Sequence, residues 1–348
     1  MRSLWGVLLV LAACGNDGTG VDVDSGPTDW GTEKRTFEFG PYTLQGGEEV
    51  EDDCVQISLH NETYIYINSV ELTTGPGFHH SNWFWVPETT FAGEDGTYKC
   101  DDRNFNEPVA AIFGGVLFAQ STQAPHEVQT FPEGVVIKIP PRAKIVAQIH
   151  LLNPTDEALT VRPEIAVKPI AEADVRTLMA GISFQNQSLV LAPGSHSRFS
   201  VTCELGEKHR ELFGRDPDFK IYYALAHYHD LATKLTLEAI TPTGEAATIY
   251  TTENNVGDVL GGMLDPQFSM SGYTKLRLSC EFMNTRADTV RWGNGDGEMC
   301  VFLAFSDSTY NWGGGVNDRG VMPIRGVDEG SMQTWDSPCS LFAGDASR

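Results

Sequence analysis

The sequence predicts an all-β protein of the sandwich or jelly-roll class. Short runs in which apolar and polar residues alternate recur along the chain, and this period of two is typical of strands with one buried face. Clusters of Gly, Pro, Asn and Asp separate the runs, as tight turns require. The best helical candidate, 204–213, is short. Many short strands without long helices indicate sheets packed face to face.

The predicted strands follow one another in chain order. They are Val55–Leu59, Tyr64–Val70, Val135–Ile139, Lys144–Leu152, Leu159–Val167, Arg198–Cys203, Lys220–His229, Lys234–Ile240, Ala247–Thr251, Lys275–Phe282 and Cys300–Phe305. A chain of 348 residues is long enough for two domains, so we expect two β-sandwiches. The segment 168–174 follows a strand and contains a proline, which makes it the expected seam between domains at 36–168 and 169–348.

The N-terminus predicts export. A basic residue, Arg2, precedes an apolar run from Leu4 to Ala13, too short to cross a membrane. The end of this run, Leu-Ala-Ala-Cys, resembles the bacterial lipobox, in which the cysteine, here Cys14, is lipidated and becomes the mature N-terminus. A signal that is simply cleaved is the alternative. Residues 15–35 are rich in Gly, Asp and Thr and predict a flexible acidic tether. We therefore expect a lipoprotein at the bacterial cell envelope, on the outer membrane or cell surface, held to the membrane by lipid alone.

The charge of the chain argues against nucleic acid as a partner. There are 47 acidic and 24 basic residues, which gives a formal net charge of −23. Binding of nucleic acid needs a basic surface to neutralise phosphates, and this sequence has no basic stripe. We interpret the acidity as a solvated surface.

The cysteines predict disulfide bonds. Seven cysteines minus Cys14 leave six, an even number with no Cys-x-x-Cys pair, in a chain expected in an oxidising compartment. This pattern favours three disulfides over a thiolate metal site, although the sequence alone allows about fifteen pairings. The six are Cys54, Cys100, Cys203, Cys280, Cys300 and Cys339.

Two histidines on one strand suggest part of a metal site. His227 and His229 follow an apolar run that begins at Lys220, and residues two apart on a strand share a face. Tyr228 is expected on the opposite face. Two imidazoles side by side make half of a metal site, although a pair of ordinary core or surface histidines fits the same pattern.

Three further positions carry possible ligands. His79 and His80 follow a Gly-Pro-Gly bend, and a backbone bent at glycine can turn adjacent side chains toward one point. His150 lies near the end of an apolar strand, where a hydrogen-bonded core histidine is the usual alternative. Met299 precedes a strand, where a methionine is usually core. A thioether beside two imidazoles is nevertheless a soft ligand set that suits Cu(I) and suits zinc poorly.

These motifs together resemble a known family. His79-His80, Gln148-Ile149-His150 followed by Asn153-Pro154, His227-x-His229 and Glu298-Met299-Cys300 occur in this order and at these intervals. The set is similar to that of the copper type II, ascorbate-dependent monooxygenases, the family of peptidylglycine α-hydroxylating monooxygenase and dopamine β-monooxygenase. The resemblance covers roughly residues 36 to 340.

The resemblance implies a fold and two copper sites per chain. The fold would be two jelly-roll β-sandwiches, in a chain expected to be a monomer. One copper would be held by His79, His80 and His150, and would supply an electron. The other, held by His227, His229 and Met299, would bind O2 and hydroxylate a C–H bond of a small molecule or peptide. The two sites would face each other across an open, solvent-filled cleft, and ascorbate or another reductant would reduce both.

The resemblance also implies a disulfide pairing. Cys54 and Cys100 flank the adjacent histidines, as a bond of the first domain does in the family. Cys280 would pair with Cys300, next to Met299, which leaves Cys203 for Cys339.

The chain departs from the family where peptide substrates bind. The peptide-processing members hold the substrate carboxylate with an arginine two residues before the first histidine of His-x-His, and this chain has Leu225 there. Their asparagine and tyrosine after the methionine correspond to Val301 and Leu303. A carboxylate buried against leucines is costly, so we do not expect peptides with a C-terminal glycine extension as substrates. A non-catalytic copper-binding or adhesion lipoprotein on the same scaffold is the alternative. A zinc hydrolase is disfavoured because no His-Glu-x-x-His pattern occurs.

Overall fold

The computed structural model describes residues 30–346, except residues 122 and 294. The expected signal, Cys14 and most of the expected tether lie outside the described residues. The fold starts earlier than expected, because Trp30, assigned to the tether, is 6% exposed and donates a hydrogen bond from its indole N–H to the carbonyl of Leu59, 2.8 Å away. Arg35 then opens the first strand and stacks its guanidinium on the Trp30 ring at 4.3 Å.

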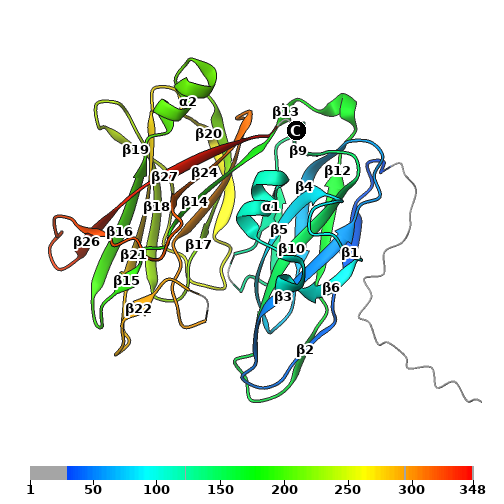
Figure 1. Cartoon of the computed structure of the whole chain (residues 1–348), viewed down its shortest axis with the longest axis horizontal. Coiled ribbons are helices and arrows are strands. Elements are labelled where there is room, and N and C mark those ends of the chain that lie inside the picture. Colours follow the sequence, from blue (N-terminus) through cyan, green and yellow to red (C-terminus); the bar gives the residue numbers. More distant parts are fainter. Residues whose placement is uncertain (1–29, 122, 294, 347–348) are drawn as a thin grey trace, which may run out of the picture.

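The protein is all-β and consists of two β-sandwiches that lie side by side (Figure 1). All strands up to residue 178 pair with one another, and all strands from residue 180 onward pair with one another. The division therefore falls later than the expected seam at 168–174. The reason is β13 (Thr177–Leu178), which still pairs in parallel with β9 (Val135–Ile139) of the first half.

In the first half, two sheets enclose one apolar core. One sheet has the order β1 (Arg35–Glu38), β12 (Glu164–Pro169), β4 (Ile65–Thr73), β9 and β13, with β8 (His126–Thr130) also on β4. The other has the order β6 (Gly96–Lys99), β3 (Glu49–Ser58), β10 (Ala143–Leu152), β5 (Phe78–Pro87) and β7 (Gly115–Ala119). A separate pair joins β2 (Tyr42–Leu44) and β11 (Leu159–Val161). The predicted strand 159–167 is thus two strands, interrupted at Pro163, which has no N–H to donate.

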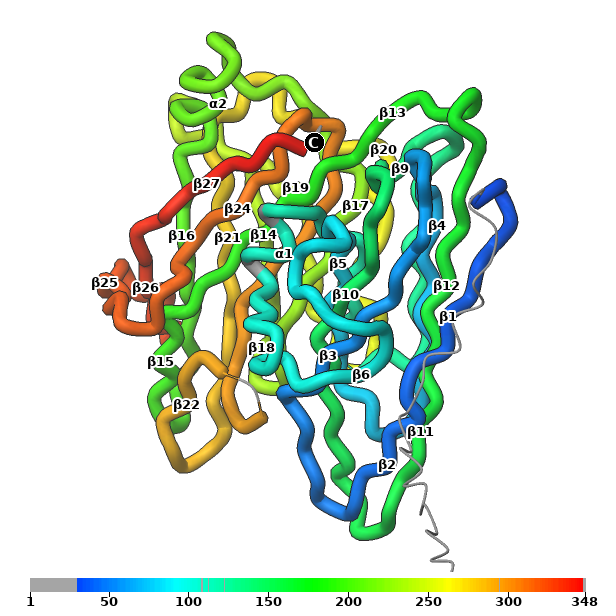
Figure 2. The backbone as a smooth tube through the Cα atoms, turned by 45° about the vertical axis from the view of Figure 1, so that its right-hand side comes forward, coloured from blue at the N-terminus to red at the C-terminus, as the bar shows by residue number. Residues whose placement is uncertain are grey.

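The second half repeats this arrangement with two six-stranded sheets (Figure 2). One has the order β20 (Gly261–Ser269), β17 (Lys220–His227), β23 (Val301–Ser306), β14 (Ala180–Asn186), β24 (Tyr310–Val316) and β27 (Ser340–Asp345). The other has the order β19 (Ala246–Thr252), β18 (Ala232–Ile240), β21 (Lys275–Met283), β16 (His196–Cys203), β26 (Gln333–Pro338) and β25 (Ile324–Arg325). A short pair joins β15 (Val190–Leu191) and β22 (Val290–Arg291). The alternating burial of β14 and β18 is the period of two that the sequence shows.

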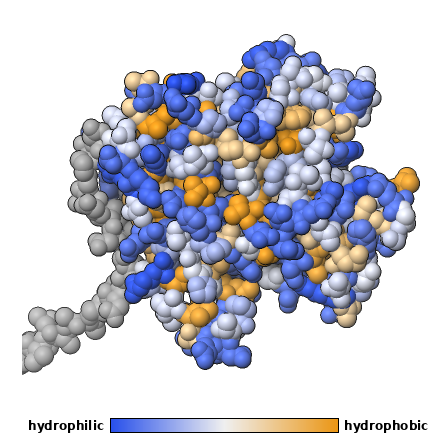
Figure 3. Space-filling model, turned by 180° about the vertical axis from the view of Figure 1, so that it is seen from behind, coloured by the Kyte–Doolittle hydropathy of each residue, from blue (hydrophilic) through white to orange (hydrophobic). Residues whose placement is uncertain are grey.

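The helices are few and short. The predicted helix at 204–213 is confirmed as α2 (Leu205–Phe213), whereas α1 (Glu107–Phe113) and the 3-10 turns at Cys100–Arg103 and Glu172–Asp174 were not predicted. No helix in the described part of the chain is long and apolar enough to cross a membrane. The face drawn in Figure 3 is largely polar with scattered apolar residues, as the net charge of the sequence suggests.

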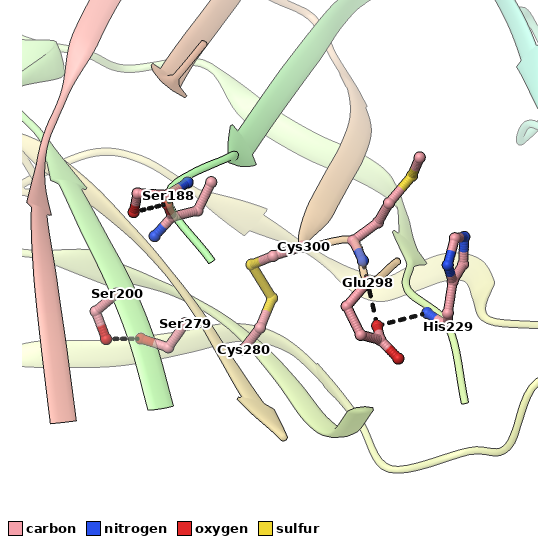
Figure 4. Close-up of a disulfide and its surroundings, with 9 residues drawn as sticks. Ser188, Ser200, His229, Ser279, Cys280, Glu298 and Cys300 are labelled. Carbon is pink, nitrogen blue, oxygen red and sulfur yellow. Dashed lines mark hydrogen bonds between the residues drawn. A yellow bond between two sulfur atoms is a disulfide. The ribbon is translucent and has the colours of Figure 1, made fainter. Parts of the chain in front are cut away.

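The three disulfides have the pairing that the resemblance implies. Cys54 bonds to Cys100, Cys203 to Cys339 and Cys280 to Cys300. The first bond ties β3 to the turn that precedes α1. The other two link strands of the second half, and the bond at Cys300 fixes the start of β23 (Figure 4).

One strand packs against both halves of the protein. β17 is buried along nearly its whole length, and its alternate residues belong to different cores. Ala224 and Ala226 lie in the core of the second half, whereas Tyr223 and Leu225 pack into the core of the first. A strand covered on both faces reads as a continuous apolar run, as this one does.

The contact between the halves is apolar, with a buried polar link beside it. The Phe131 ring of the first half lies 5.3 Å, centroid to centroid, from that of Phe305 on β23. Nearby, the hydroxyl of Ser121 accepts the N–H of Leu260 from the second half at 2.7 Å and donates to the Glu127 carboxylate at 2.9 Å. Glu127 is 2% exposed and also accepts the Ser121 N–H.

Glu127 predicts a pH dependence of stability. Burial raises the pKa of Glu127 from 4.5 to about 7, against the opposing effect of the Ser121 hydrogen bonds. Between these two values the folded chain binds more protons than the unfolded chain, so stability falls as pH rises through this window. Glu127→Gln removes this contribution. We expect the free energy of unfolding of this variant, measured by urea denaturation, to rise relative to that of wild type as the pH increases from 4.5 to 7.

Glu133→Gln provides the control, because the side chain of Glu133 is 83% exposed. The difference between this variant and wild type should stay constant across the same window. A constant difference for Glu127→Gln would contradict the prediction.

Candidate metal centre

Three histidines of the first half meet at one end of a sheet. His80 on β5 lies directly opposite His150 on β10, but the next pair is Leu151 with Phe78. His79 is therefore an extra residue in β5, a β-bulge. A regular strand would send two adjacent side chains to opposite faces, and the bulge removes this alternation. The sequence predicted that both histidines turn to one point but attributed this to the preceding glycine bend.

The three imidazoles are close enough to share an ion. Their ring centroids are 4.4 to 5.2 Å apart, and one nitrogen from each ring lies within 4.8 Å of the others. The Nδ1 atoms of His79 and His80 are 3.0 Å apart. His79 and His150 are 8% and 3% exposed, and His80 is partly buried. The structure thus brings together all three ligands predicted for the first site.

Burial lowers the pKa of several rings in this cluster. It lowers the pKa of His79 from 6.5 to about 3, with further lowering from the neighbouring His150 and His229. The pKa values of His80 and His227 are also well below 6.5, mainly because of burial and then because of the adjacent histidines. A neutral imidazole has a free electron pair for a metal, so these lowered pKa values favour the state that a ligand needs in His79, His80 and His227.

The second ligand set follows from strand register. His227 is the last residue of β17 and pairs with Val301 on antiparallel β23. Extending this register by two residues sets His229 opposite Met299. The predicted strand 220–229 thus ends two residues early, and His229 lies just beyond the strand. Tyr228 points away, as expected, into the second core, where it is 1% exposed.

A buried carboxylate fixes the end of this strand pair. Glu298 is 0% exposed, and one of its oxygens accepts the N–H groups of both His229 and Met299, at 3.1 and 3.2 Å (Figure 4). Its other oxygen accepts the N–H of Leu231 at 2.7 Å. Burial raises the pKa of Glu298 to about 7, although these three hydrogen bonds oppose the rise. Glu298 therefore holds one histidine and the methionine in fixed relation.

The role of Glu298 was missed in the sequence. It lies within the Glu-Met-Cys motif, but its partners at 229 and 231 are distant along the chain. An acidic residue directly before a ligand was the one available signal.

Hydrogen bonds select which nitrogen each ring presents. His229 Nδ1 donates to the Gly297 carbonyl at 2.9 Å, which leaves Nε2 as the ligand atom. His150 Nε2 donates to the Glu49 carboxylate at 2.8 Å, which leaves Nδ1. Both remaining nitrogens are buried, and neither has a hydrogen-bond partner among the described residues. A buried donor or acceptor without a partner is costly, and a bound ion would satisfy both atoms.

The two ligand sets adjoin. The rings of His80 and His227 are 4.6 Å apart between centroids, and those of His79 and His229 are 5.6 Å apart. The open cleft that the resemblance implies is therefore not what this structure has. The cause is the apolar packing of β17 on the first half, because the face of β17 that carries Tyr223 and Leu225 also carries His227.

The donors present fit copper better than other common ions. Imidazole and thioether groups are borderline to soft ligands, and the candidate donors here are five imidazoles and one thioether. Magnesium and calcium require mainly oxygen ligands, and a structural zinc site seldom includes a thioether. His79, His80 and His150 would hold one ion, and His227, His229 and Met299 another.

A cavity of about 650 Å³ opens beside both sets. His80, His150, His227 and Met299 line one end. The rest of the wall is apolar, aromatic and amide in character. It includes Phe84, Phe105, Val116, Trp292, Trp312, Phe342, Asn82, Gln185, Gln187 and Asn311. No Lys or Arg occurs among the described residues that line this cavity, whereas Glu51 and Glu107 do.

The positions that differ from the family lie in two places. Val301 and Leu303 line the cavity. Leu225 is 1% exposed in the core between the halves and is not among the residues that line the cavity.

Comparisons with known proteins identify no family. No protein-family model matches the chain, and no curated protein matches its sequence. Among solved structures, the major capsid protein P2 of bacteriophage PM2 aligns with 79% of this chain and 97% of its own, at 6% identity and a TM-score of 0.29. The glycosylasparaginase PNGase F from Flavobacterium meningosepticum aligns with 79% of this chain and 96% of its own, at 8% identity and a TM-score of 0.33. Similarities of this size support no inference about function.

Removal of the Glu298 carboxylate tests its structural role. Glu298→Ala leaves three buried backbone N–H groups without their acceptor, and each such loss costs about 1–3 kcal/mol. We expect the free energy of unfolding to fall by at least about 3 kcal/mol. Glu298→Gln keeps one acceptor oxygen and should cost less. An alanine variant as stable as wild type in chemical denaturation would show that the carboxylate does not hold the strand ends.

Proposed function

We propose that this protein is a copper-dependent monooxygenase that hydroxylates a C–H bond with O2 and a one-electron reductant such as ascorbate. The observation that carries the proposal is a cluster of five histidine rings beside a cavity of about 650 Å³, whose lining includes His80, His150, His227 and Met299. The donors come from widely separated parts of the chain. Within this cluster, His150 Nδ1 and His229 Nε2 are buried without a hydrogen-bond partner among the described residues, which a bound ion would remedy.

The cofactor and the chain have separate tasks. Bound copper would supply one-electron redox chemistry and activation of O2. In the overall reaction, one oxygen atom enters the C–H bond and the other leaves as water, with consumption of two electrons and two protons. Two one-electron sites are a sensible minimum for this stoichiometry. The chain itself presents neutral nitrogens, fixes their tautomers through Glu49 and Gly297, and holds the substrate against His227 and Met299.

The two donor sets suit different tasks. Imidazoles alone accommodate both oxidation states of copper, whereas a thioether favours the reduced ion. The reduced ion is the one that must meet O2, so the His-His-Met set is the proposed site of hydroxylation. The three-histidine set is the proposed electron store.

The cavity favours an uncharged or cationic substrate with an apolar or aromatic body. Its described wall combines aromatic rings and amides with two carboxylates, Glu51 and Glu107. Burial raises the pKa of Glu107, whose carboxylate accepts a hydrogen bond from Asn82 at 3.0 Å. A substrate carboxylate would meet like charge and no cation from the described wall.

We further propose export and lipid attachment through Cys14. Three disulfides support export, because disulfides persist in oxidising compartments. The described residues begin at Trp30, and Cys14 lies 16 residues before it in the sequence.

Metal analysis of ligand variants tests the proposed function. Wild type should bind two copper ions per chain and consume O2 with ascorbate. His150→Ala should lose one ion, and Met299→Ala should lose the sulfur signal in X-ray absorption of the copper. Both variants should lose O2-dependent hydroxylation, because each removes a donor from one set.

Met322→Ala serves as the matched control, since Met322 is 72% exposed. It should keep both ions, the sulfur signal and the activity. Tight copper with no O2 consumption would favour a binding or adhesion protein, and Met299→Ala with wild-type hydroxylation would refute the assignment of that site.

Substrate charge gives an independent prediction. A peptide with a C-terminal glycine extension should not be hydroxylated, whereas its methyl ester should be a better substrate, because the described cavity wall carries carboxylates and no cation. Product formation can be followed by mass spectrometry. Equal turnover of acid and ester would contradict the prediction.

A further inference from the structure

The two donor sets differ in the hydrogen-bond partners behind their histidines. His150 Nε2 bonds to the carboxylate of Glu49 at 2.8 Å. His229 Nδ1 bonds to the neutral carbonyl of Gly297 at 2.9 Å. Partners of this kind fix the orientation of a ligand and change its basicity, and an anionic partner does so more strongly than a neutral one.

Glu49 is placed to act on His150 specifically. It opens β3, the strand beside β10, and the register of these strands is irregular between Ile149 and Leu151, next to His150. The side chain of Glu49 is 33% exposed, whereas that of His150 is 4% exposed. Glu49 thus bonds to a buried ring from the surface. No Lys or Arg forms an ion pair with Glu49 among the described residues, so its charge is not neutralised by such a contact.

Glu49 also lies at the boundary between the two halves. A side-chain carbon added at Gly295 of the second half would lie 3.2 Å from Glu49 Oε2. Gly295 has a φ of +54° and belongs to the turn before Gly297 and Glu298. The carboxylate therefore adjoins the segment that carries the His-His-Met set while bonding to the three-histidine set.

We propose that Glu49 is a positioning residue that makes the three-histidine set the more reducing of the two. The inference rests on the proposed function. The hydrogen bond fixes the proton on His150 Nε2 and presents Nδ1 to the rings of His79 and His80. The negative charge behind the ring favours Cu(II) over Cu(I) in this set. In the other set, a carbonyl and a thioether favour the reduced ion.

The difference gives electrons a preferred direction. An electron supplied by ascorbate, a one-electron donor, is held less tightly at the three-histidine set than at the His-His-Met set. With copper bound, His79, His80 and His150 would hold the ion that gives up this electron, and His227, His229 and Met299 would hold the ion that receives it, one electron for one electron. The outer carboxylate, 101 residues distant from His150 in the chain, supplies this asymmetry.

Two variants of Glu49 separate position from charge. Glu49→Gln keeps an oxygen that can accept from His150 Nε2 but removes the charge. Glu49→Ala removes both. Glu51→Gln removes the same charge from a neighbouring residue whose carboxylate is 3.9 Å from the same nitrogen, beyond hydrogen-bond distance, and is the matched control.

The first measurement needs no metal. Nitrogen-15 NMR of the metal-free protein reports the tautomer of His150. We expect one tautomer, protonated at Nε2, in wild type, Glu49→Gln and Glu51→Gln, and a mixture in Glu49→Ala. A mixture in wild type would overturn the positioning role.

The second measurement uses the copper-loaded protein. Glu49→Gln should lower the Cu(II) affinity of the three-histidine set by about 10–100-fold, the usual effect of losing such a partner. If Cu(I) affinity is unchanged, each tenfold loss raises the reduction potential of this set by about 59 mV. Glu51→Gln should give a smaller rise. An equal rise in both variants, or none in Glu49→Gln, would overturn the proposal.

These outcomes distinguish the inference from the proposed function. A chain that binds no copper overturns both. A chain that binds two ions and hydroxylates its substrate, but whose potential is indifferent to Glu49→Gln, overturns the inference alone.

Discussion

The antiparallel pairing of β17 with β23, held at its end by the Glu298 carboxylate, is the constraint on which the candidate site depends. The pairing ends at His227 with Val301, two residues from His229 and Met299, and the carboxylate then accepts hydrogen bonds from the backbone of both residues. The disulfide at Cys300 anchors the same strand from its other side. A buried carboxylate with a raised pKa is an unfavourable group in a core, and the three N–H groups it accepts account for its presence.

The same strand joins the two halves. Alternate residues of β17 enter different cores, so packing of Tyr223 and Leu225 against the first half brings His227 to His80. The site is therefore a product of the interface and belongs to neither sandwich alone. The cavity beside the site also depends on how the halves pack, because residues of both halves line it, such as His150 of the first and Val301 of the second.

Much of this architecture could be predicted from local sequence patterns. The period of two identified most strands, and the resemblance named six candidate ligands, of which the structure brings the five histidine rings close together. The domain boundary was misplaced because the pairing of β13 with β9 is a long-range contact that leaves no mark near residue 170. Trp30 was assigned to a tether because a single tryptophan among polar residues does not reveal its hydrogen bond to Leu59.

The hydrogen bonds from carboxylates to the candidate ligands could not be predicted, because they also join residues that are distant in the sequence. Glu49 and His150 are 101 residues apart, and Glu298 and His229 are 69 apart, so neither pair forms a motif. The bulge at His79 is likewise a property of strand pairing and not of the His-His dipeptide. The closeness of the two sets depends on how the sandwiches pack, which the pattern of a single chain does not specify.

The contact between the His80 and His227 rings has a thermodynamic consequence. An ion that reorients one of these rings would press on its neighbour 4.6 Å away, so that occupancy of one proposed donor set would change the affinity of the other. Linkage requires this influence to be equal in both directions. If the two proposed donor sets bind ions, they would form one cooperative unit, and titration of the protein with a single ion species would then depart from two independent isotherms.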